Sequence, residues 1–249
     1  MSYLILEDYD GNAYNFPPQF WIRSDGWTSR SNTQANVYYP GRSEYGDGLP
    51  DSRNLSISGI LYSDSEANME TAKRSLEKAC RKGGSLSISD DVVSRFLEVD
   101  KTLNFDFSYI KYPIIAQVNI SFDVLFPYWQ AVTESSDINV MSGSGTISVT
   151  NNGDDTVLTR VQIDNAADNA SLSLVNLSFG SASTDYTDVG FLNGDQLIID
   201  AENGTVKKNG LDVIENFDPP WLRLVPDVNT INYVGSAATV TIYYRELYL

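Results

Sequence analysis

The segment Gly194–Gly210, GDQLIIDAENGTVKKNG, decides the fold more clearly than any other part of the chain. Its apolar run Leu197–Ile199 predicts a strand. Asn203-Gly204 is a dipeptide that tolerates positive φ at both positions of a tight turn, and Thr205-Val206 begins a second strand. Asn209-Gly210 closes that second strand in the same way. The segment therefore predicts a β-hairpin, and a hairpin alone indicates no particular function.

The rest of the second half repeats this pattern of short strands separated by turn residues. We expect strands at Thr146–Thr150, Arg160–Asp164, Ser171–Phe179, Gln196–Asp200, Thr205–Lys207, Trp221–Val225, Ile231–Val234 and Thr239–Leu247. No helical period occurs among them. Several short strands with frequent turns are typical of a β-sandwich.

The first half contains one clear helix signal, between Ser65 and Lys82. Apolar residues recur there at helical spacing: Met69, Ala72, Leu76, Ala79 and Cys80. Ser65 is a suitable N-cap, and Gly83-Gly84 is a natural stop. One apolar face predicts a helix that lies on a sheet, with Cys80 as a small buried hydrophobic residue.

Strands are expected on both sides of this helix, at Leu55–Tyr62, Ser85–Ser89, Phe96–Val99, Leu103–Tyr109 and Ile114–Trp129. The last is the longest strand signal, and the residues that share its apolar face are Ala116, Val118, Ile120, Phe122 and Val124. Between Ala131 and Gly145 the periodicity stops, which predicts a linker. We therefore expect two domains, residues 1–132 and 133–249.

Composition narrows the possible functions. The chain has 17 Lys+Arg and 33 Asp+Glu, a net charge of −16, which argues against specific binding of nucleic acids. The sequence lacks histidine and has one cysteine, so His-dependent catalysis and Cys-based zinc sites are excluded. We expect no membrane span, because no segment approaches the ~20 apolar residues that one needs, and no signal peptide. The chain is expected to be made in the cytoplasm.

Two kinds of acidic motif could suggest a site. Asp8-Tyr9-Asp10-Gly11-Asn12 resembles the start of a calcium loop, but its glycine and glutamate positions do not fit one, so we interpret it as a turn. The pairs Asp90-Asp91 and Asp154-Asp155 could serve a glycosidase only with a defined separation across a sugar. We interpret them as turn residues as well, and we expect no catalytic residue, metal or cofactor.

The segment Tyr14–Tyr45 is rich in aromatic residues with interleaved arginines. Three interpretations are open: a sugar-stacking platform, ordinary core, or an interface with another protein, where Tyr, Trp and Arg are enriched. Irregular spacing and the arginines favour the interface. The candidate interface residues are Trp21, Arg23, Trp27, Arg30, Tyr38, Tyr39 and Arg42.

The order of these motifs resembles the distal tail protein family of phages with long, non-contractile tails. In the second half the resemblance rests on the hairpin above, on LRLVPDVNTI at Leu222–Ile231 and on the last strand, which ends in YYRELYL. In the first half it rests on RNLSISGILYS at Arg53–Ser63, on the single helix and on FDVLFPYW at Phe122–Trp129. One departure is Asp227, where the family often has glycine after proline.

The resemblance implies a mainly β fold, with an N-terminal β-rich belt domain containing one α-helix, followed by a galectin-like C-terminal β-sandwich. It implies a structural virion protein of the tail tip, a homo-hexameric ring that joins the tail tube to the host-adsorption apparatus. The implied partners are further copies of the chain, the tail tube protein, a tail-associated tip protein and receptor-binding proteins, with DNA passing through the channel. The alternatives are a carbohydrate-binding β-sandwich that contacts the host surface and, with less support, an acidic glycosidase.

Overall fold

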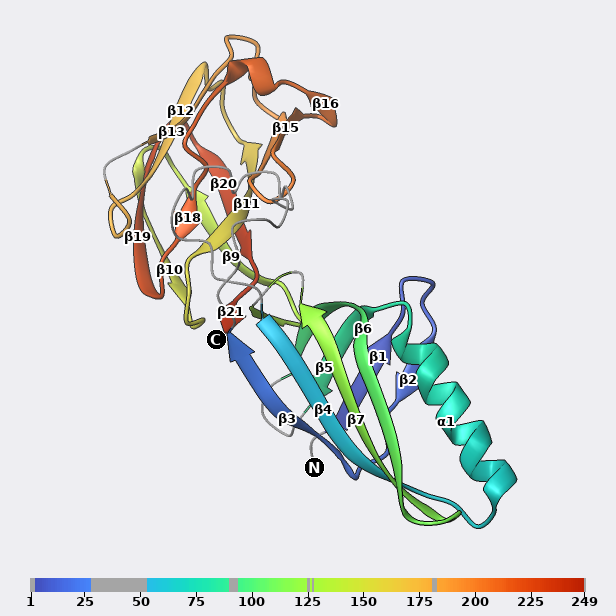
Figure 1. The fold of residues 1–249 in the computed structure, drawn as a ribbon. Helices are drawn as coiled ribbons and strands as arrows, with labels where there is room; N and C mark the ends of the chain where they lie inside the picture. The colour runs from blue at the N-terminus through green and yellow to red at the C-terminus, as the bar shows by residue number, and fades with distance from the viewer. Residues whose placement is uncertain are drawn as a thin grey trace, which may run out of the picture. The chain divides into compact units, whose positions relative to one another are not determined.

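The computed structural model describes residues 3–27, 53–89, 94–124, 126, 128–180 and 183–248. Their contacts form two compact units, of which one ends at residue 132 and the other begins at residue 133 (Figure 1). In the described part of the chain, the N-terminal unit consists of a sheet and an α-helix. The C-terminal unit consists of strands and one short 3-10 helix.

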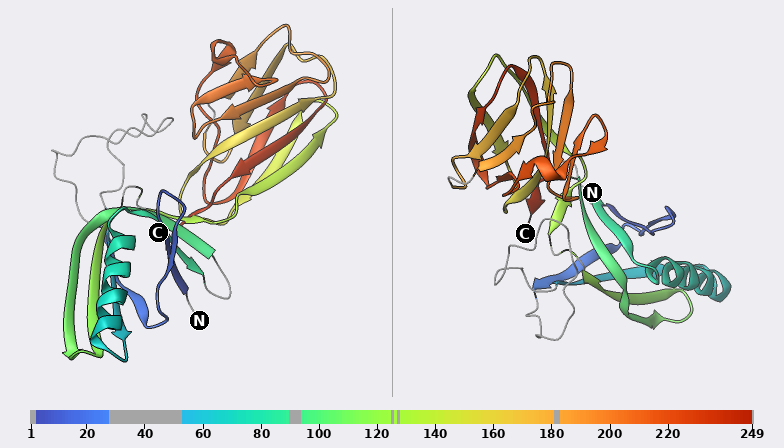
Figure 2. Two further views of the ribbon diagram at one scale, coloured as in Figure 1. Left: turned by 90° about the vertical axis from the view of Figure 1, so that its right-hand side faces the viewer. Right: turned by 90° about the horizontal axis from the view of Figure 1, so that it is seen from above.

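An antiparallel sheet forms the body of the N-terminal unit (Figure 2). Its strands, in spatial order, are β2 (Ala13–Asn15), β1 (Tyr3–Glu7), β5 (Gly84–Ser89), β6 (Ser94–Lys111), β7 (Ile115–Val124), β4 (Arg53–Tyr62) and β3 (Phe20–Trp27). The short strand β8 (Trp129–Ala131) also pairs with β6. The first half of β6 pairs with β5 and its second half with β7, so this one strand belongs to two parts of the sheet.

The continuity of β6 corrects one expectation. Phe96–Val99 and Leu103–Tyr109 were expected as separate strands, but both belong to one strand of 18 residues. The polar pair Asp100-Lys101 looked like a break between them. Instead, the register with β7 shifts between Val99 and Asn104, and such irregularities bend a strand without ending it.

The core of the N-terminal unit lies between the sheet and helix α1 (Glu66–Cys80). Ser65 caps the helix, because its side chain accepts a hydrogen bond of 3.3 Å from the backbone N–H of Asn68. Met69, Leu76 and Cys80 are fully buried, and burial raises the pKa of the Cys80 thiol to about 12. The alternate residues of β7 from Ala116 to Val124 are also buried. The helix and this strand are therefore confirmed.

The C-terminal unit is a sandwich of two antiparallel sheets. The first sheet has the order β10 (Gly145–Asn151), β19 (Asp227–Val234), β12 (Ser171–Asn176), β13 (Ser183–Thr187) and β17 (Phe217–Asp218). The second has the order β16 (Leu211–Asp212), β15 (Thr205–Lys208), β14 (Gln196–Asp200), β11 (Val157–Asn165), β20 (Ala238–Tyr244) and β9 (Ser135–Met141), and β18 (Arg223–Leu224) also pairs with β11. The remaining elements are η1 (Ile214–Asn216) and β21 (Leu247–Tyr248). Alternate residues along these strands are buried, as a sandwich requires.

Strand β9 corrects a second expectation, because it lies where a linker was expected. It has the alternation of a strand, but its exposed positions hold the apolar side chains Ile138 and Val140. The less exposed positions hold Asp137 and Asn139. The usual polar and apolar sides are thus exchanged, so the hydrophobic pattern gave no strand signal.

The two turns of the decisive hairpin differ from each other. Asn209 and Gly210 both have positive φ, 50° and 82°, as a two-residue hairpin turn requires. In the other turn the positive φ is at Gly204, 62°, whereas Asn203 donates hydrogen bonds to the Asp200 carboxylate through its backbone N–H (3.0 Å) and its side chain (2.8 Å). The tight turn expected at Asn203-Gly204 is therefore a longer one.

Asp227 occupies the position at which the sequence departs from the family pattern, and it has a φ of 73°. Aspartate tolerates this left-handed conformation better than most residues. The buried Asn229 holds the turn, because its Oδ1 accepts from the Val225 N–H (2.9 Å) and its Nδ2 donates to the Val225 carbonyl (2.8 Å). The turn thus forms without glycine.

Candidate functional site

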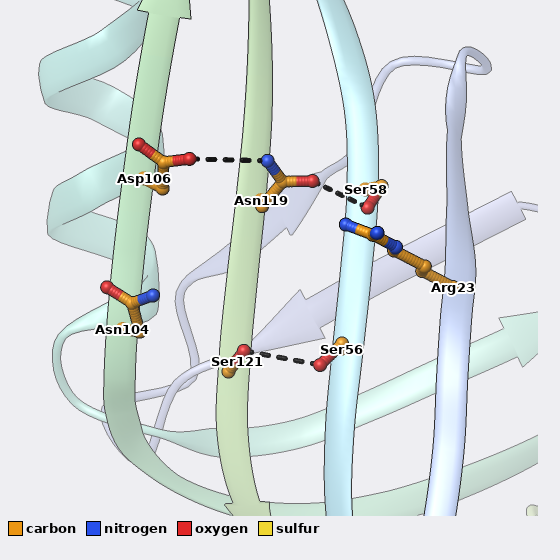
Figure 3. A pocket seen from close by; sticks show the side chains of 7 residues that line it. All are labelled: Arg23, Ser56, Ser58, Asn104, Asp106, Asn119 and Ser121. Carbon is orange, nitrogen blue, oxygen red and sulfur yellow. Dashed lines mark hydrogen bonds between the residues drawn. The ribbon is translucent and has the colours of Figure 1, made fainter.

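Strands β3, β4, β7 and the second half of β6 form a sheet with one apolar and one polar face. Leu55 and Ile57 of β4 are opposite Phe122 and Ile120 of β7, and all four side chains are buried. The intervening positions on the same strands carry serine and asparagine. Figure 3 shows these polar side chains on the face that points away from α1.

The polar face contains a hollow of about 370 Å³. The side chains that line it are Arg23, Ser56, Ser58, Asn104, Asp106, Asn119 and Ser121. They come from four neighbouring strands that the sheet register brings side by side (Figure 3). Every one of them is polar, so the hollow lacks the apolar lining that is typical of small-molecule sites.

Cross-strand hydrogen bonds fix much of this polar surface. Ser58 Oγ donates to Asn119 Oδ1 at 2.8 Å, and Asn119 Nδ2 donates to Asp106 Oδ2 at 3.4 Å. One row away, the hydroxyls of Ser56 and Ser121 are 3.2 Å apart. The side chains of three strands therefore form a connected polar wall whose groups largely satisfy one another. Its only carboxylate in the hollow, Asp106, has no second carboxylate there to support acid–base catalysis.

Two of the candidate interface residues lie on this polar face. Trp21 is opposite Ser58 across the β3–β4 pair and is 50% exposed, and the exposed Arg23 lines the hollow. Trp27 is the last residue of β3, and its side chain is outside the described part. The candidates Arg30, Tyr38, Tyr39 and Arg42 lie outside the described residues altogether.

The beginning of the aromatic segment is core. Phe16 and Phe20 are each 5% exposed, and their ring centroids are 5.4 Å apart. The Phe20 ring packs against Gly59 of the neighbouring strand. Interface and core were competing interpretations of the whole segment, and the structure divides it, with the core residues preceding Trp21.

Sequence reasoning missed the serines and asparagines of the polar wall. Their signal was present in LSISGILY and IIAQVNISFDV, where Ser56, Ser58, Asn119 and Ser121 alternate with apolar residues. Such alternation was used to identify the buried face. The opposite face was not examined for what its polar residues form together.

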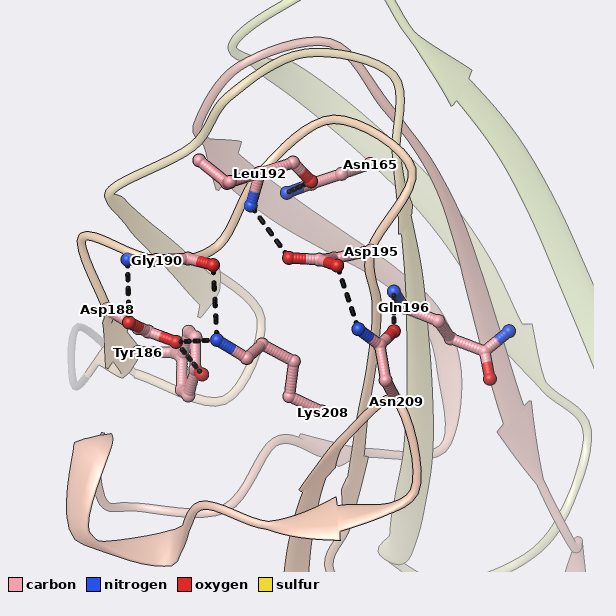
Figure 4. A network of polar contacts seen from close by, with 9 residues as sticks. All are labelled: Asn165, Tyr186, Asp188, Gly190, Leu192, Asp195, Gln196, Lys208 and Asn209. Atoms are coloured by element: carbon pink, nitrogen blue, oxygen red, sulfur yellow. Dashed lines mark hydrogen bonds and ion pairs between the residues drawn. The ribbon is translucent and has the colours of Figure 1, made fainter.

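The C-terminal unit contains a second polar cluster, around Asp188 (Figure 4). Asp188 accepts hydrogen bonds from Lys208 Nζ (2.5 Å), from the Gly190 N–H (2.8 Å) and from the Tyr186 hydroxyl (3.0 Å). The hydrogen bond from Lys208 is the main reason that the pKa of Asp188 is lowered. Because every acceptor here has donors from the same unit, the cluster fastens the loop before β14 to β15 and has a structural role.

The other candidate motifs remain unassigned to any chemistry. Asp155 Oδ1 accepts a hydrogen bond from the Thr156 N–H at 2.6 Å in a turn, and Asp90 and Asp91 lie outside the described residues. In the described part of the chain, no group of three or more His, Cys, Asp or Glu side chains could hold a metal ion. No described helix is long and apolar enough to cross a membrane.

Comparison with known proteins identifies the C-terminal unit. Residues 152–248 match the family model of the siphovirus-type tail component, C-terminal domain. These residues belong to that family. No curated protein matches the chain. The chain is thus a structural component of a phage tail over at least this unit.

Solved structures extend the similarity to the whole chain. The crystal structure of the Dit protein of phage SPP1, described there as a hub of the adsorption apparatus in phages that infect Gram-positive bacteria, is 15% identical with a TM-score of 0.65. The match covers 98% of this chain and 99% of that one, which shows a shared fold. A baseplate structure of phage P2 also matches, at 10% identity, with a TM-score of 0.41 and 97% of each chain covered. The expected resemblance to phage distal tail proteins, and the mainly β fold with a belt and a sandwich, are confirmed.

Proposed function

We propose that this chain is the hub of a long, non-contractile phage tail, in which six copies form a ring between the tail tube and the tail-tip apparatus. The observation that carries the proposal is the match of residues 152–248 to the siphovirus tail component family. The N-terminal unit adds a sheet with one covered face and one free polar face. Such a sheet suits the wall of a channel, because its helix can lie on the outside of the ring.

The chemistry of the polar face suits the passage of DNA. DNA binds to proteins mainly through Lys and Arg, which displace counterions from its phosphates. Among the described residues that line the hollow, Arg23 is the one cation and Asp106 the one anion, and the others are hydroxyls and amides. A wall of this kind hydrogen-bonds to water and holds few phosphates. DNA is therefore expected to pass without sticking.

The two units have different charges, which suggests different tasks. Residues 1–132 contain 12 basic and 17 acidic residues, a net charge of −5, and residues 133–249 contain 5 and 16, a net charge of −11. Packing copies of the more acidic unit against one another costs more electrostatic free energy, although salt screens charges beyond ~8–10 Å. We therefore assign the ring contacts to residues 1–132 and an outer position to the sandwich.

Mass photometry of the purified chain and electron microscopy test this proposal. Six copies of 27.6 kDa give a particle of about 166 kDa, which should appear as a ring with a central channel. Antibody labelling of intact virions should mark the distal end of the tail. Monomers at every concentration, together with no incorporation into tails, would refute the hub function.

The same proposal predicts no enzymatic turnover and treats sugar binding as the competing function. Host cell-wall polysaccharide incubated with the protein should release no sugar. If release is seen and disappears in Asp154→Asn or Asp155→Asn, the carboxylate pair is catalytic and the proposal is wrong on this point. Specific binding on a glycan array would instead favour the carbohydrate-binding alternative.

A further inference from the structure

We propose that the ring closes by strand pairing, with β3 of one copy next to the second half of β6 of the following copy, and that Arg23 faces Asp106 of that neighbour. The inference rests on the proposed hub function. It names the two edges that meet and the charge pair that selects them. The partner is therefore a second copy of this chain.

Both strands have a free edge in the described part of the structure. β3 pairs with β4 along its length, and no other described strand pairs with it. Residues 102–111 of β6 pair with β7 alone, because β5 and β8 pair only with the first half of the strand. Free edges present backbone N–H and C=O groups that another strand can satisfy.

The strand directions allow one edge to continue the other. The pairs β3–β4, β4–β7 and β7–β6 are all antiparallel, so β3 and β6 run in opposite directions. A copy rotated about an axis along the strands therefore places its β3 antiparallel to the β6 of its neighbour, with both polar faces on the same side. Repeating such a head-to-tail contact closes a ring.

The two edges carry opposite charges on the polar face. Arg23 is on β3, and Asp106 lies on β6 between the polar-face residues Asn104 and Ser108. Within one copy β4 and β7 separate the two strands, a distance of about 14 Å at ~4.8 Å per strand. No described ion pair includes Arg23, and its exposed side chain lies over Ser58 of its own sheet (Figure 3). Turning this long side chain across the free edge directs it toward the neighbour.

Opposite charges also disfavour the wrong pairings. Two β3 edges would bring together two Arg23 residues, and two β6 edges two Asp106 residues, so like edges repel. The register of β3 and β4 shifts between Ile22 and Ser24, which places Arg23 at a bulge. Bulges and charges at an edge prevent indiscriminate pairing. Here they leave an edge that accepts a partner with a carboxylate in the matching position.

A charge exchange tests the pair in the full chain. Arg23→Glu and Asp106→Arg are each expected to raise the dissociation constant of the ring by about tenfold, and the double variant should restore it toward the wild-type value. Arg74→Glu is the control, because it makes the same change of charge on an exposed position of α1. Circular dichroism confirms that each variant is folded. Single variants that assemble normally, or a double variant without rescue, overturn the charge pair.

Disulfide trapping tests the strand pairing independently of ring stability. The variant Arg23→Cys with Asp106→Cys should form a ladder of covalent oligomers on oxidation, whereas either single variant should stop at dimers or below. Wild-type rings without a ladder overturn the pairing and leave the hub function intact. A ladder without closed rings supports the pairing and contradicts the hub function. Cys80 is buried and is left in place as an internal control.

Discussion

Gly59 shows how one residue can be fixed by its neighbour. A Cβ added at this position would lie 2.3 Å from the Phe20 ring, far inside van der Waals contact. Phe20 is buried against Phe16, so its ring has little room to move. We expect Gly59→Ala to lower the free energy of unfolding by about 1–3 kcal/mol. Urea denaturation followed by fluorescence measures this loss.

The loss should depend on the ring. In the background of Phe20→Leu, whose side chain is smaller, Gly59→Ala is expected to cost clearly less, so the two substitutions should show coupling in a double-mutant cycle. Equal costs in both backgrounds would mean that the ring is not the obstacle.

The ion pair of Asp188 and Lys208 predicts a dependence on pH. Their side chains are 14% and 22% exposed, and the hydrogen bond from Lys208 lowers the pKa of Asp188 from its usual 3.8. A carboxyl with a lowered pKa stabilises the fold above its unfolded pKa, and this contribution is lost as pH falls through the folded value. Lys208→Met should therefore lower the free energy of unfolding by about 1 kcal/mol at pH 7 and have little effect below the pKa of Asp188.

Thermal unfolding at a series of pH values measures this difference. Lys207→Met is the matched control, because Lys207 is the exposed neighbour on the same strand. It should unfold like the wild type throughout. A constant difference between Lys208→Met and the wild type from pH 7 to pH 3 would show that lost packing of the lysine stem, rather than charge, is responsible.

The turn between β15 and β16 determines where that hairpin reverses. Lys208 is opposite Leu211, so Asn209 and Gly210 form a two-residue turn with φ values of 50° and 82°. An alanine at Gly210 has to adopt a left-handed conformation, which costs about 1 kcal/mol or more. We expect Gly210→Ala to lower the free energy of unfolding by that amount in chemical denaturation. Gly210→Asn should cost less, since asparagine tolerates this conformation, and equal losses would contradict the explanation.

Elements with an ordinary hydrophobic pattern could be predicted from the sequence. Helix α1 and strand β7 each have an apolar face, and both were found. β9 could not be found, because its apolar residues Ile138 and Val140 face solvent, and β6 was divided because Asp100-Lys101 lies within it. The candidate site was half found: composition identified Trp21 and Arg23, whereas the polar wall beside them depends on how β4, β7 and β6 are paired. Strand pairing between distant segments is a tertiary property that local patterns do not specify.

The division of the chain into two units predicts two domains that fold independently. In the C-terminal unit, two sheets bury a common core that includes Val161, Ile163, Leu174, Ile231 and Ile242, each at most 1% exposed. A core of this size is enough for a domain of about 117 residues to fold alone. We expect a fragment of residues 133–249 to be soluble and to give a β-type circular dichroism spectrum. It should unfold in one cooperative transition and, because it carries most of the negative charge, sediment as a monomer. The complementary fragment of residues 1–132 should retain self-association, because it contains both proposed ring edges. If the C-terminal fragment assembles while the N-terminal fragment stays monomeric, the ring contacts belong to the sandwich.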